Sequence, residues 1–195
     1  TLDDKITKNV KQVFKKMWEE GLVYRGKRLV NFCTFHGTSF SDIEVEHEDR
    51  VTSLYYLKYG PFELVTTRPE TIMGDTGVAF HPHDERYKDL EGQEIEIEGP
   101  EKSFRVKVVA DEIVDKEFGT GVVKVTPAHS FDDSEIAERH NLPYIEVIGK
   151  DGSMNENAGK YAGMTVLEAR EAVVKDLKAK GLVIKIDENY HNRVG

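Results

Sequence analysis

Glu94-Ile95-Glu96-Ile97-Glu98 and, shortly after it, Phe104-Arg105-Val106-Lys107-Val108 alternate polar and apolar side chains without a break. Successive side chains of a β-strand point to opposite faces, so each stretch predicts a strand with one buried face and one wet face. Gly99-Pro100 lies between the two and is typical of a turn. These stretches place the chain among the β-rich folds.

Short strand-like segments recur over much of the chain. They span residues 28–32, 41–46, 51–59, 62–67 and 77–80, with turn residues such as Gly60-Pro61 between them. Because no long helix separates them, the pattern favours an antiparallel sheet or barrel. We therefore expect an α+β fold, mainly β, with flanking helices.

Three segments show a helical period instead. Residues 1–20 predict an amphipathic helix that Gly21 ends, and residues 130–140 predict a second. Residues 165–180 predict a third, which begins with a capping box of Thr165 and Glu168. The apolar positions of the first helix are Val10, Val13, Phe14, Met17 and Trp18.

Composition limits the classes of protein. The chain has 195 residues, of which 38% are hydrophobic and 32% charged, which is typical of one compact globular domain and not of disordered or fibrous proteins. No apolar run is long enough to span a bilayer and no signal-peptide core is recognisable, so neither a membrane nor a secreted role is expected. Cys33, the single cysteine, excludes an intramolecular disulfide and fits a reducing compartment.

The charge balance bears on nucleic acids. A formal net charge of −9 disfavours sequence-independent binding, because long-range repulsion opposes the approach of a phosphate backbone. It does not exclude a domain that receives one end of a nucleic acid held by another domain.

The first of two polar segments that could form a functional site is Val65-Thr66-Thr67-Arg68-Pro69-Glu70-Thr71-Ile72-Met73-Gly74-Asp75-Thr76. Its hydroxyls, guanidinium and carboxylates suit a ligand with phosphates or hydroxyls, and a strand that runs to Arg68 would place Thr66 and Arg68 on one face. The alternative is structural: Thr67 is a helix N-cap, Pro69 lies in the first turn and Glu70 completes a capping box. The local pattern alone favours the structural alternative.

The second polar segment runs from Gly119 to Asp133. Alternation places Lys124 and Thr126 on one strand face, and the chain then passes through Pro127 into a helix. Asp133 in the first turn of that helix fits either a functional acid or a capping box with Ser130. Gly119-x-Gly121 lacks the third glycine of a dinucleotide fingerprint, so a phosphate loop is disfavoured.

The histidine and cysteine spacings do not predict a complete metal site. His81 with His83, and His129 with Asp133, are incomplete ligand sets, so solvated or structural histidines are favoured. Cys33 and His36 have the spacing of half a structural zinc site, and the sequence contains no matching half.

Six motifs of this chain occur in one order: Thr66-Thr67-Arg68-Pro69-Glu70-Thr71, Gly74-Asp75-Thr76, His81-Pro82, Gly119-Thr120-Gly121, Pro127-Ala128-His129 and Arg139-His140-Asn141-Leu142-Pro143. Together they resemble the editing domain of class I aminoacyl-tRNA synthetases. Arg68-Pro69-Glu70-Thr71 with Gly74-Asp75-Thr76 favours the valyl branch, and so do Tyr24-Arg25-Gly26-Lys27-Arg28-Leu29-Val30-Asn31 and Ser41-Asp42-Ile43-Glu44-Val45. The resemblance covers nearly the whole chain. It implies a β-barrel core with flanking helices, inserted into a larger catalytic domain.

The resemblance also implies an activity: hydrolysis of the ester of a mischarged tRNA, here threonyl-tRNA(Val). By position, Asp133 corresponds to the aspartate that binds the α-ammonium group of the substrate. Arg68 and Lys124 are expected to face the terminal adenosine and phosphates, and Thr67 and Thr126 to orient the ester and water. We expect Asp133, Thr67 and Lys124 to be catalytic; the substrate-binding residues are expected to be Thr66, Arg68, Asp75, Thr126, Ser130 and Asp132.

The implied hydrolysis uses no metal and no covalent intermediate, whereas ATP and magnesium belong to the synthetic site of the parent enzyme, whose signatures this sequence lacks. The expected partners are the 3′ end of tRNA(Val) and the parent catalytic domain, in the cytoplasm and away from membranes. Zinc at Cys33 and His36 is disfavoured. We expect residues 1–40 to enter from the parent domain, 41–188 to form the editing domain and 189–195 to return to the parent, as in an excised insertion.

The sequence departs from the valyl pattern at Ser130, so other functions of the domain stay open. Valyl enzymes commonly carry an aspartate where this chain has Ser130, a position linked to recognition of the substrate side chain, and Ser130 or Asp132 would have to replace it. The alternatives are an isoleucyl- or leucyl-type editing domain with another amino acid as substrate, or a non-catalytic insertion that docks the tRNA acceptor end.

Overall fold

The structure is a computed structural model that describes residues 3–26 and 28–194. Lys27, within the valyl-like stretch that begins at Tyr24, and Gly195, at the end of the predicted return segment, lie outside the described residues. So do Thr1 and Leu2 of the predicted first helix.

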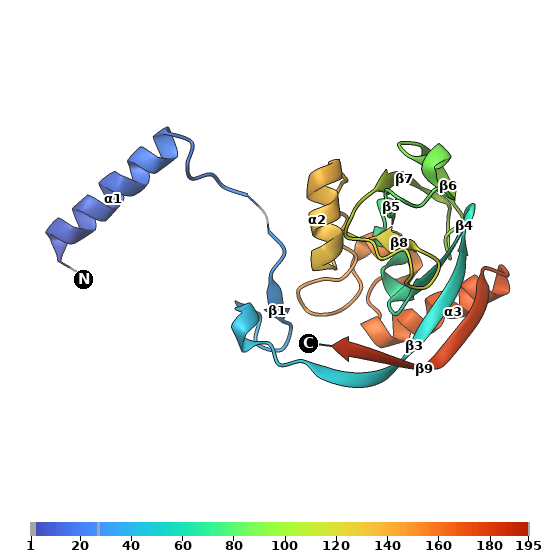
Figure 1. The fold of residues 1–195 in the computed structure, drawn as a ribbon. Coiled ribbons are helices and arrows are strands. Elements are labelled where there is room, and N and C mark those ends of the chain that lie inside the picture. Colours follow the sequence, from blue (N-terminus) through green and yellow to red (C-terminus); the bar gives the residue numbers. More distant parts are fainter. Residues whose placement is uncertain (1–2, 27, 195) are drawn as a thin grey trace.

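Helix α1 (Asp4–Glu19) confirms the first predicted helix. Asp3 caps it by accepting hydrogen bonds from the backbone of Lys5 and Ile6, and Gly21 follows the helix with φ of 72°. Figure 1 shows α1 apart from the two larger sheets, and none of its residues is buried. Its apolar stripe, which includes Val10 and Trp18, is therefore exposed.

Strands β1 (Asn31–Cys33) and β2 (Thr38–Phe40) pair as a small antiparallel hairpin. The prediction of a strand over 41–46 was wrong, because Asp42–Glu44 forms the 3₁₀ turn η1. The carboxylate of Glu44 accepts a 2.8 Å hydrogen bond from the backbone N–H of Ser41. This local bond favours a turn over an extended strand.

Three strands form an antiparallel sheet in the order β4-β3-β9. They are β3 (Glu48–Tyr59), β4 (Phe62–Thr66) and β9 (Val183–Val194). The predicted turn at Gly60-Pro61 joins β3 to β4, and Gly60 supplies the positive φ of 59° that the turn requires. In Figure 1, β3 and β9 lie side by side as two long, curved, antiparallel strands.

The other large sheet has the strand order β6-β7-β5-β8. Its strands are β5 (Gly77–Phe80), β6 (Glu94–Ile97), β7 (Phe104–Ala110) and β8 (Val122–Val125). The alternating stretches at residues 94–98 and 104–108 thus become neighbouring antiparallel strands.

Two details of the β prediction were wrong. Strands β5 and β7 are parallel, because the chain crosses through η3 (Lys88–Leu90) and β6 before it reaches β7. Within residues 3–26 and 28–194 the strands form three sheets and no closed barrel, although β4 packs against β8 and brings the two larger sheets together.

Helices flank the sheets as expected. Helix α2 (Phe131–His140) follows β8, and α3 (Val166–Ala179) begins with the predicted capping box of Thr165 and Glu168. The short 3₁₀ segments η2 (Pro69–Gly74) and η4 (Glu156–Tyr161) contact α3. The fold is therefore α+β, as predicted.

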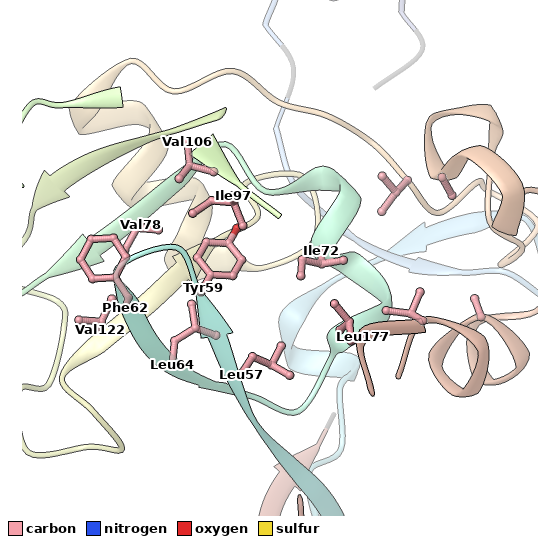
Figure 2. Close-up of a cluster of buried hydrophobic side chains, with 14 of the residues drawn as sticks. Leu57, Tyr59, Phe62, Leu64, Ile72, Val78, Ile97, Val106, Val122 and Leu177 are labelled. Carbon is pink, nitrogen blue, oxygen red and sulfur yellow. The ribbon is translucent and has the colours of Figure 1, made fainter. Parts of the chain in front are cut away.

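One large apolar cluster joins the two sheets and α3. Figure 2 shows Tyr59 of β3 among aliphatic side chains from both sheets, including Leu64 and Val106. Within the described ranges, no helix combines the length and the apolar character that crossing a membrane requires.

Candidate active site

A pocket of about 350 Å³ opens where the end of β4, the end of β8 and the start of α2 meet. Strands β3 and β9 and the loop before β8 supply further parts of its wall. All the predicted site residues except Asp75 line this pocket: Thr66, Thr67, Arg68, Lys124, Thr126, Ser130, Asp132 and Asp133. The two polar segments, separated in the chain by residues 77–118, thus form one site.

Lys124 lies in the pocket floor with its ammonium turned into the protein. It donates hydrogen bonds to Asp75 Oδ1 (2.8 Å), to Thr71 Oγ1 (2.9 Å) and to Thr126 Oγ1 (2.5 Å). An ammonium has three N–H donors, so these bonds use all of them. Lys124 therefore acts on a ligand in this geometry as a fixed positive charge and not as a free hydrogen-bond donor.

Asp75 lies beneath the pocket and is 3% exposed. Besides the bond from Lys124, its Oδ1 accepts a hydrogen bond from the hydroxyl of Thr126. Its Oδ2 accepts a 2.8 Å hydrogen bond from the phenol of Tyr59. Burial raises the pKa of Asp75, while Lys124, Thr126 and Tyr59 oppose the rise. Asp75 is thus an anchor for Lys124 and not a wall of the pocket.

Asp133 stands at the start of α2 and faces the pocket. Its Oδ2 accepts a 2.8 Å hydrogen bond from the backbone N–H of Thr126, and its own N–H donates to Ser130 Oγ at 3.3 Å. Burial raises its pKa, and the nearby charge of Lys124 opposes the rise. The capping interpretation is half right: Ser130 caps the helix, whereas the carboxylate of Asp133 bonds across to the end of β8.

Glu70 does not complete a capping box with Thr67, as the structural alternative proposed. The N-cap of η2 is Arg68, with Pro69 as the first helical residue. The carboxylate of Glu70 is fully buried and pairs with Arg170 of α3 through two 2.8 Å hydrogen bonds. Glu70 therefore takes part in a long-range ion pair and not in a local helix cap.

Arg68 and Thr66 do not share a strand face, because β4 ends at Thr66. The hydroxyl of Thr66 accepts a 3.0 Å hydrogen bond from the backbone N–H of Arg68 and turns the chain. The guanidinium of Arg68 then donates to the backbone carbonyl of His129 at 2.6 Å. This bond connects the first polar segment to the second.

His129 also lines the pocket. Its Nε2 accepts a 2.9 Å hydrogen bond from the backbone N–H of Val147, which places the ring proton on Nδ1. Burial, together with the charges of Arg68 and Lys124, lowers its pKa to about 4. His129 is therefore neutral at pH 7.

Four residues of the pocket wall come from outside the two polar segments and were not predicted. Leu54 comes from β3, Phe118 from the loop before β8, and Tyr190 and Asn192 from β9. Tyr190 and Asn192 are two positions apart and share a strand face, but residues 189–195 were predicted only to return to the parent domain. Recognition of 183–194 as one strand would have revealed this alternation.

Cys33 Sγ and His36 Nδ1 are 3.3 Å apart in the hairpin of β1 and β2. They offer two donors, whereas a structural zinc site needs four. Across the described residues, no group of three or more His, Cys, Asp or Glu side chains is placed to hold a metal ion. His83 donates its backbone N–H to His81 Nδ1 at 3.1 Å, a local turn bond.

Comparison with known proteins decides the family. The model of the family described as tRNA synthetases class I (I, L, M and V) matches residues 1–186. The chain belongs to the class I tRNA synthetases.

This class I synthetase chain is similar to valine–tRNA ligases over 98% of its length. Identity is 47% to the enzyme of Halalkalibacterium halodurans, 48% to that of Synechocystis and 47% to that of Thermotoga maritima. The chain spans about a fifth of the length of these relatives, at 22–23%.

The fold is also found in solved structures. The synthetase chain resembles the crystal structure of GlLeuRS-CP1 with a TM-score of 0.50 and 15% identity, over 66% of this chain and 84% of that one. It resembles a ternary complex of Agrobacterium radiobacter K84 agnB2 LeuRS with tRNA and LeuAMS with a TM-score of 0.50 and 17% identity, over 74% of this chain and 21% of that one. The family resemblance inferred from the motifs is thus confirmed, and so is the fold class apart from the closed barrel.

Proposed function

We propose that this chain is the editing domain of a valine–tRNA ligase and that it hydrolyses the aminoacyl ester of mischarged threonyl-tRNA(Val). Three things support this proposal: the similarity to valine–tRNA ligases, the fold shared with GlLeuRS-CP1, and the pocket that collects the predicted residues.

The carboxylate of Asp133 is the observation that carries the proposal. It stands in the pocket wall, and its Oδ2 is held by the backbone of Thr126. Its Oδ1 is left to accept a charge-assisted hydrogen bond from the α-ammonium group that every aminoacyl ester presents. Binding at that end of the substrate would place the ester carbonyl over the pocket floor.

Lys124 and Arg68 give the same pocket its positive charge. When water attacks the ester carbon, negative charge develops on the carbonyl oxygen, and a fixed cation in a partly desolvated site lowers the energy of that transition state. The bond from the carbonyl carbon to the ribose oxygen then breaks. The attacking water loses a proton, the ribose oxygen gains one, and threonine and tRNA are released.

Threonine is the proposed mischarged amino acid because a synthetic site shaped for valine does not exclude it. A hydrophobic pocket shaped for valine does not strongly reject a side chain of equal size that carries a hydroxyl. A second pocket with polar groups for that hydroxyl discriminates in the opposite sense, because valine leaves those groups unpaired. The hydroxyls of Thr67 and Ser130 and the carboxylate of Asp132 line this pocket and are the candidates.

The remaining parts of the proposal concern the parent enzyme. The 3′ end of tRNA(Val) is the proposed partner, delivered by the parent catalytic domain in the cytoplasm. ATP and magnesium would serve the synthetic site there, and editing would need neither. Residues 1–40 and 189–195 remain the proposed connections, although Tyr190 and Asn192 of the latter segment line the pocket.

The test is deacylation of threonyl-tRNA(Val) against valyl-tRNA(Val), with Asp133→Ala, Asp133→Asn and the control Glu135→Ala. Glu135 is exposed and lies two residues after Asp133 on α2, on the opposite side of the helix. We expect the wild type and the control to cleave the threonyl ester much faster than the valyl ester. Both Asp133 variants should lose this preference, since Asn keeps the shape and removes the charge.

Other outcomes favour the alternatives. Equal background rates for the wild type and Asp133→Ala would leave a docking insertion without catalysis. Fast cleavage of valyl-tRNA(Ile) or of mischarged leucine tRNA would point to an isoleucyl- or leucyl-type domain.

A further inference from the structure

Tyr59, at the end of β3, is a buried residue outside the pocket that is hydrogen-bonded to Asp75, beneath the pocket floor. It is 1% exposed and lies in the core among aliphatic side chains such as Leu57 and Leu64 (Figure 2). Its phenol is its only side-chain polar group, and it donates a 2.8 Å hydrogen bond to Asp75 Oδ2.

The two oxygens of Asp75 are held from two different sheets. Tyr59 of β3 holds Oδ2, while Lys124 of β8 and the hydroxyl of Thr126 hold Oδ1. A carboxylate bonded on both oxygens cannot rotate without breaking one of these bonds. Its position therefore determines where the ammonium of Lys124 can lie.

We propose that Tyr59 is a positioning residue for the editing site: it fixes the carboxylate of Asp75, which in turn fixes the ammonium of Lys124 under the pocket. This inference rests on the proposed function for its catalytic consequence. Its geometric part concerns only the three side chains.

Loss of the phenol would disturb Lys124 by one of two routes. A buried carboxylate oxygen without a donor is costly, so Asp75 would turn toward another donor or bind a proton. Burial already raises the pKa of Asp75, and the hydrogen bond from Tyr59 is one of the interactions that opposes the rise. The first route moves the counter-charge of Lys124 and the second removes it, so neither leaves the ammonium held in its place.

The chain offers a matched control in Tyr161. Tyr161 is also 1% exposed, belongs to the same apolar cluster and donates its phenol to a carboxylate, Asp176 Oδ2, at 2.6 Å. Neither Tyr161 nor Asp176 lines the pocket. Tyr161→Phe therefore removes a phenol-to-carboxylate hydrogen bond at the same apolar cluster without touching Lys124, although Asp176 is more exposed than Asp75.

The experiment compares Tyr59→Phe, Tyr161→Phe, Asp75→Asn and the double variant Tyr59→Phe/Asp75→Asn. Deacylation of threonyl-tRNA(Val) is followed at several substrate concentrations, and thermal unfolding is recorded for each variant. We expect Tyr59→Phe to lower kcat about tenfold with KM within about twofold, because the charge acts on the transition state. Tyr161→Phe should lower Tm but leave kcat within about twofold, and the double variant should equal Asp75→Asn alone.

A second readout does not need activity. The three hydrogen bonds of the Lys124 ammonium should protect it from exchange with water, so its ¹H–¹⁵N signal should be visible in the wild type and Tyr161→Phe and broadened in Tyr59→Phe. A signal that persists in Tyr59→Phe, equal kcat losses in the two Phe variants, or multiplying effects of Tyr59→Phe and Asp75→Asn would each overturn the inference. A wild type without threonyl-tRNA cleavage but with the expected signals would instead overturn the proposed function alone.

Discussion

Arg170 of α3 and Glu70 of η2, separated by 100 positions in the sequence, form an ion pair through two parallel hydrogen bonds of 2.8 Å. Hydrogen bonding to Glu70 raises the pKa of Arg170. Glu70 follows Arg68 and Pro69 directly, so this pair ties the pocket segment to α3, which packs against η2.

Glu70→Ala should destabilise the fold by about 3 kcal/mol, because it leaves the half-buried guanidinium of Arg170 without its partner. Glu171→Ala is the control, since Glu171 is an exposed neighbour on α3, and it should change stability by less than about 0.5 kcal/mol. Urea unfolding measures both. Equal midpoints for the two variants would show that the ion pair contributes nothing net.

Ser130→Ala should cost about 1 kcal/mol, because it removes the side-chain cap of α2. Ser130→Asp should stay within about 0.5 kcal/mol of the wild type, since aspartate caps equally well and bears a charge that the helix start favours. Thermal unfolding compares them. A loss in Ser130→Asp as large as that in Ser130→Ala would contradict the capping role.

His129 should make stability depend on pH between about 6.5 and 4. Its pKa in the fold is about 4, whereas an unfolded histidine has a pKa near 6.5, so between these values the unfolded chain binds more protons. The free energy of unfolding contributed by His129 is thus fully present above pH 6.5 and falls as the pH is lowered, by at most about 1.4 kcal/mol per pH unit.

His129→Gln tests this dependence, because Gln can still accept the N–H of Val147 but does not titrate in this range. Denaturant unfolding at several pH values should show a constant difference between wild type and variant above pH 7.5 and a shrinking advantage of the wild type below 6.5. Parallel curves down to pH 4 would exclude His129 as the source.

The isolated chain should bind tRNA weakly and with a shallow salt dependence. Its net charge is −9, and few cations face the pocket, so few phosphates are neutralised. A plot of log K against log salt should have a slope shallower than about −2, and Arg68→Ala should flatten it by at most about one. Tight binding with a steep slope would contradict this expectation.

Local patterns predicted most of the elements. Alternation located β6 and β7, and the capping box of Thr165 and Glu168 located the start of α3. Patterns of this kind are set by neighbours in the chain, which a sequence displays directly. The strand predicted over 41–46 failed because local hydrogen bonds, among them the one from the backbone N–H of Ser41 to the carboxylate of Glu44, hold a 3₁₀ turn there.

Contacts between distant segments were harder to predict. Nothing in the sequence near Glu70 indicates Arg170 as its partner, and nothing near Tyr59 indicates Asp75. The parallel pairing of β5 with β7 likewise depends on the path of a crossover and not on either strand alone. The family resemblance supplied the site residues, but only the structure distinguishes Asp133 in the wall from Asp75 beneath the floor.

The three acceptors around the Lys124 nitrogen explain the type of cation at this position. Asp75, Thr71 and Thr126 converge on one atom, which suits a compact ammonium with freely rotating donors. An arginine presents its donors in a flat, wider fork, so it would leave at least one of these acceptors unmatched in the space available. Two cations that look interchangeable in a sequence are therefore not equivalent here, and Lys124→Arg should behave as a disruptive substitution despite conserving the charge.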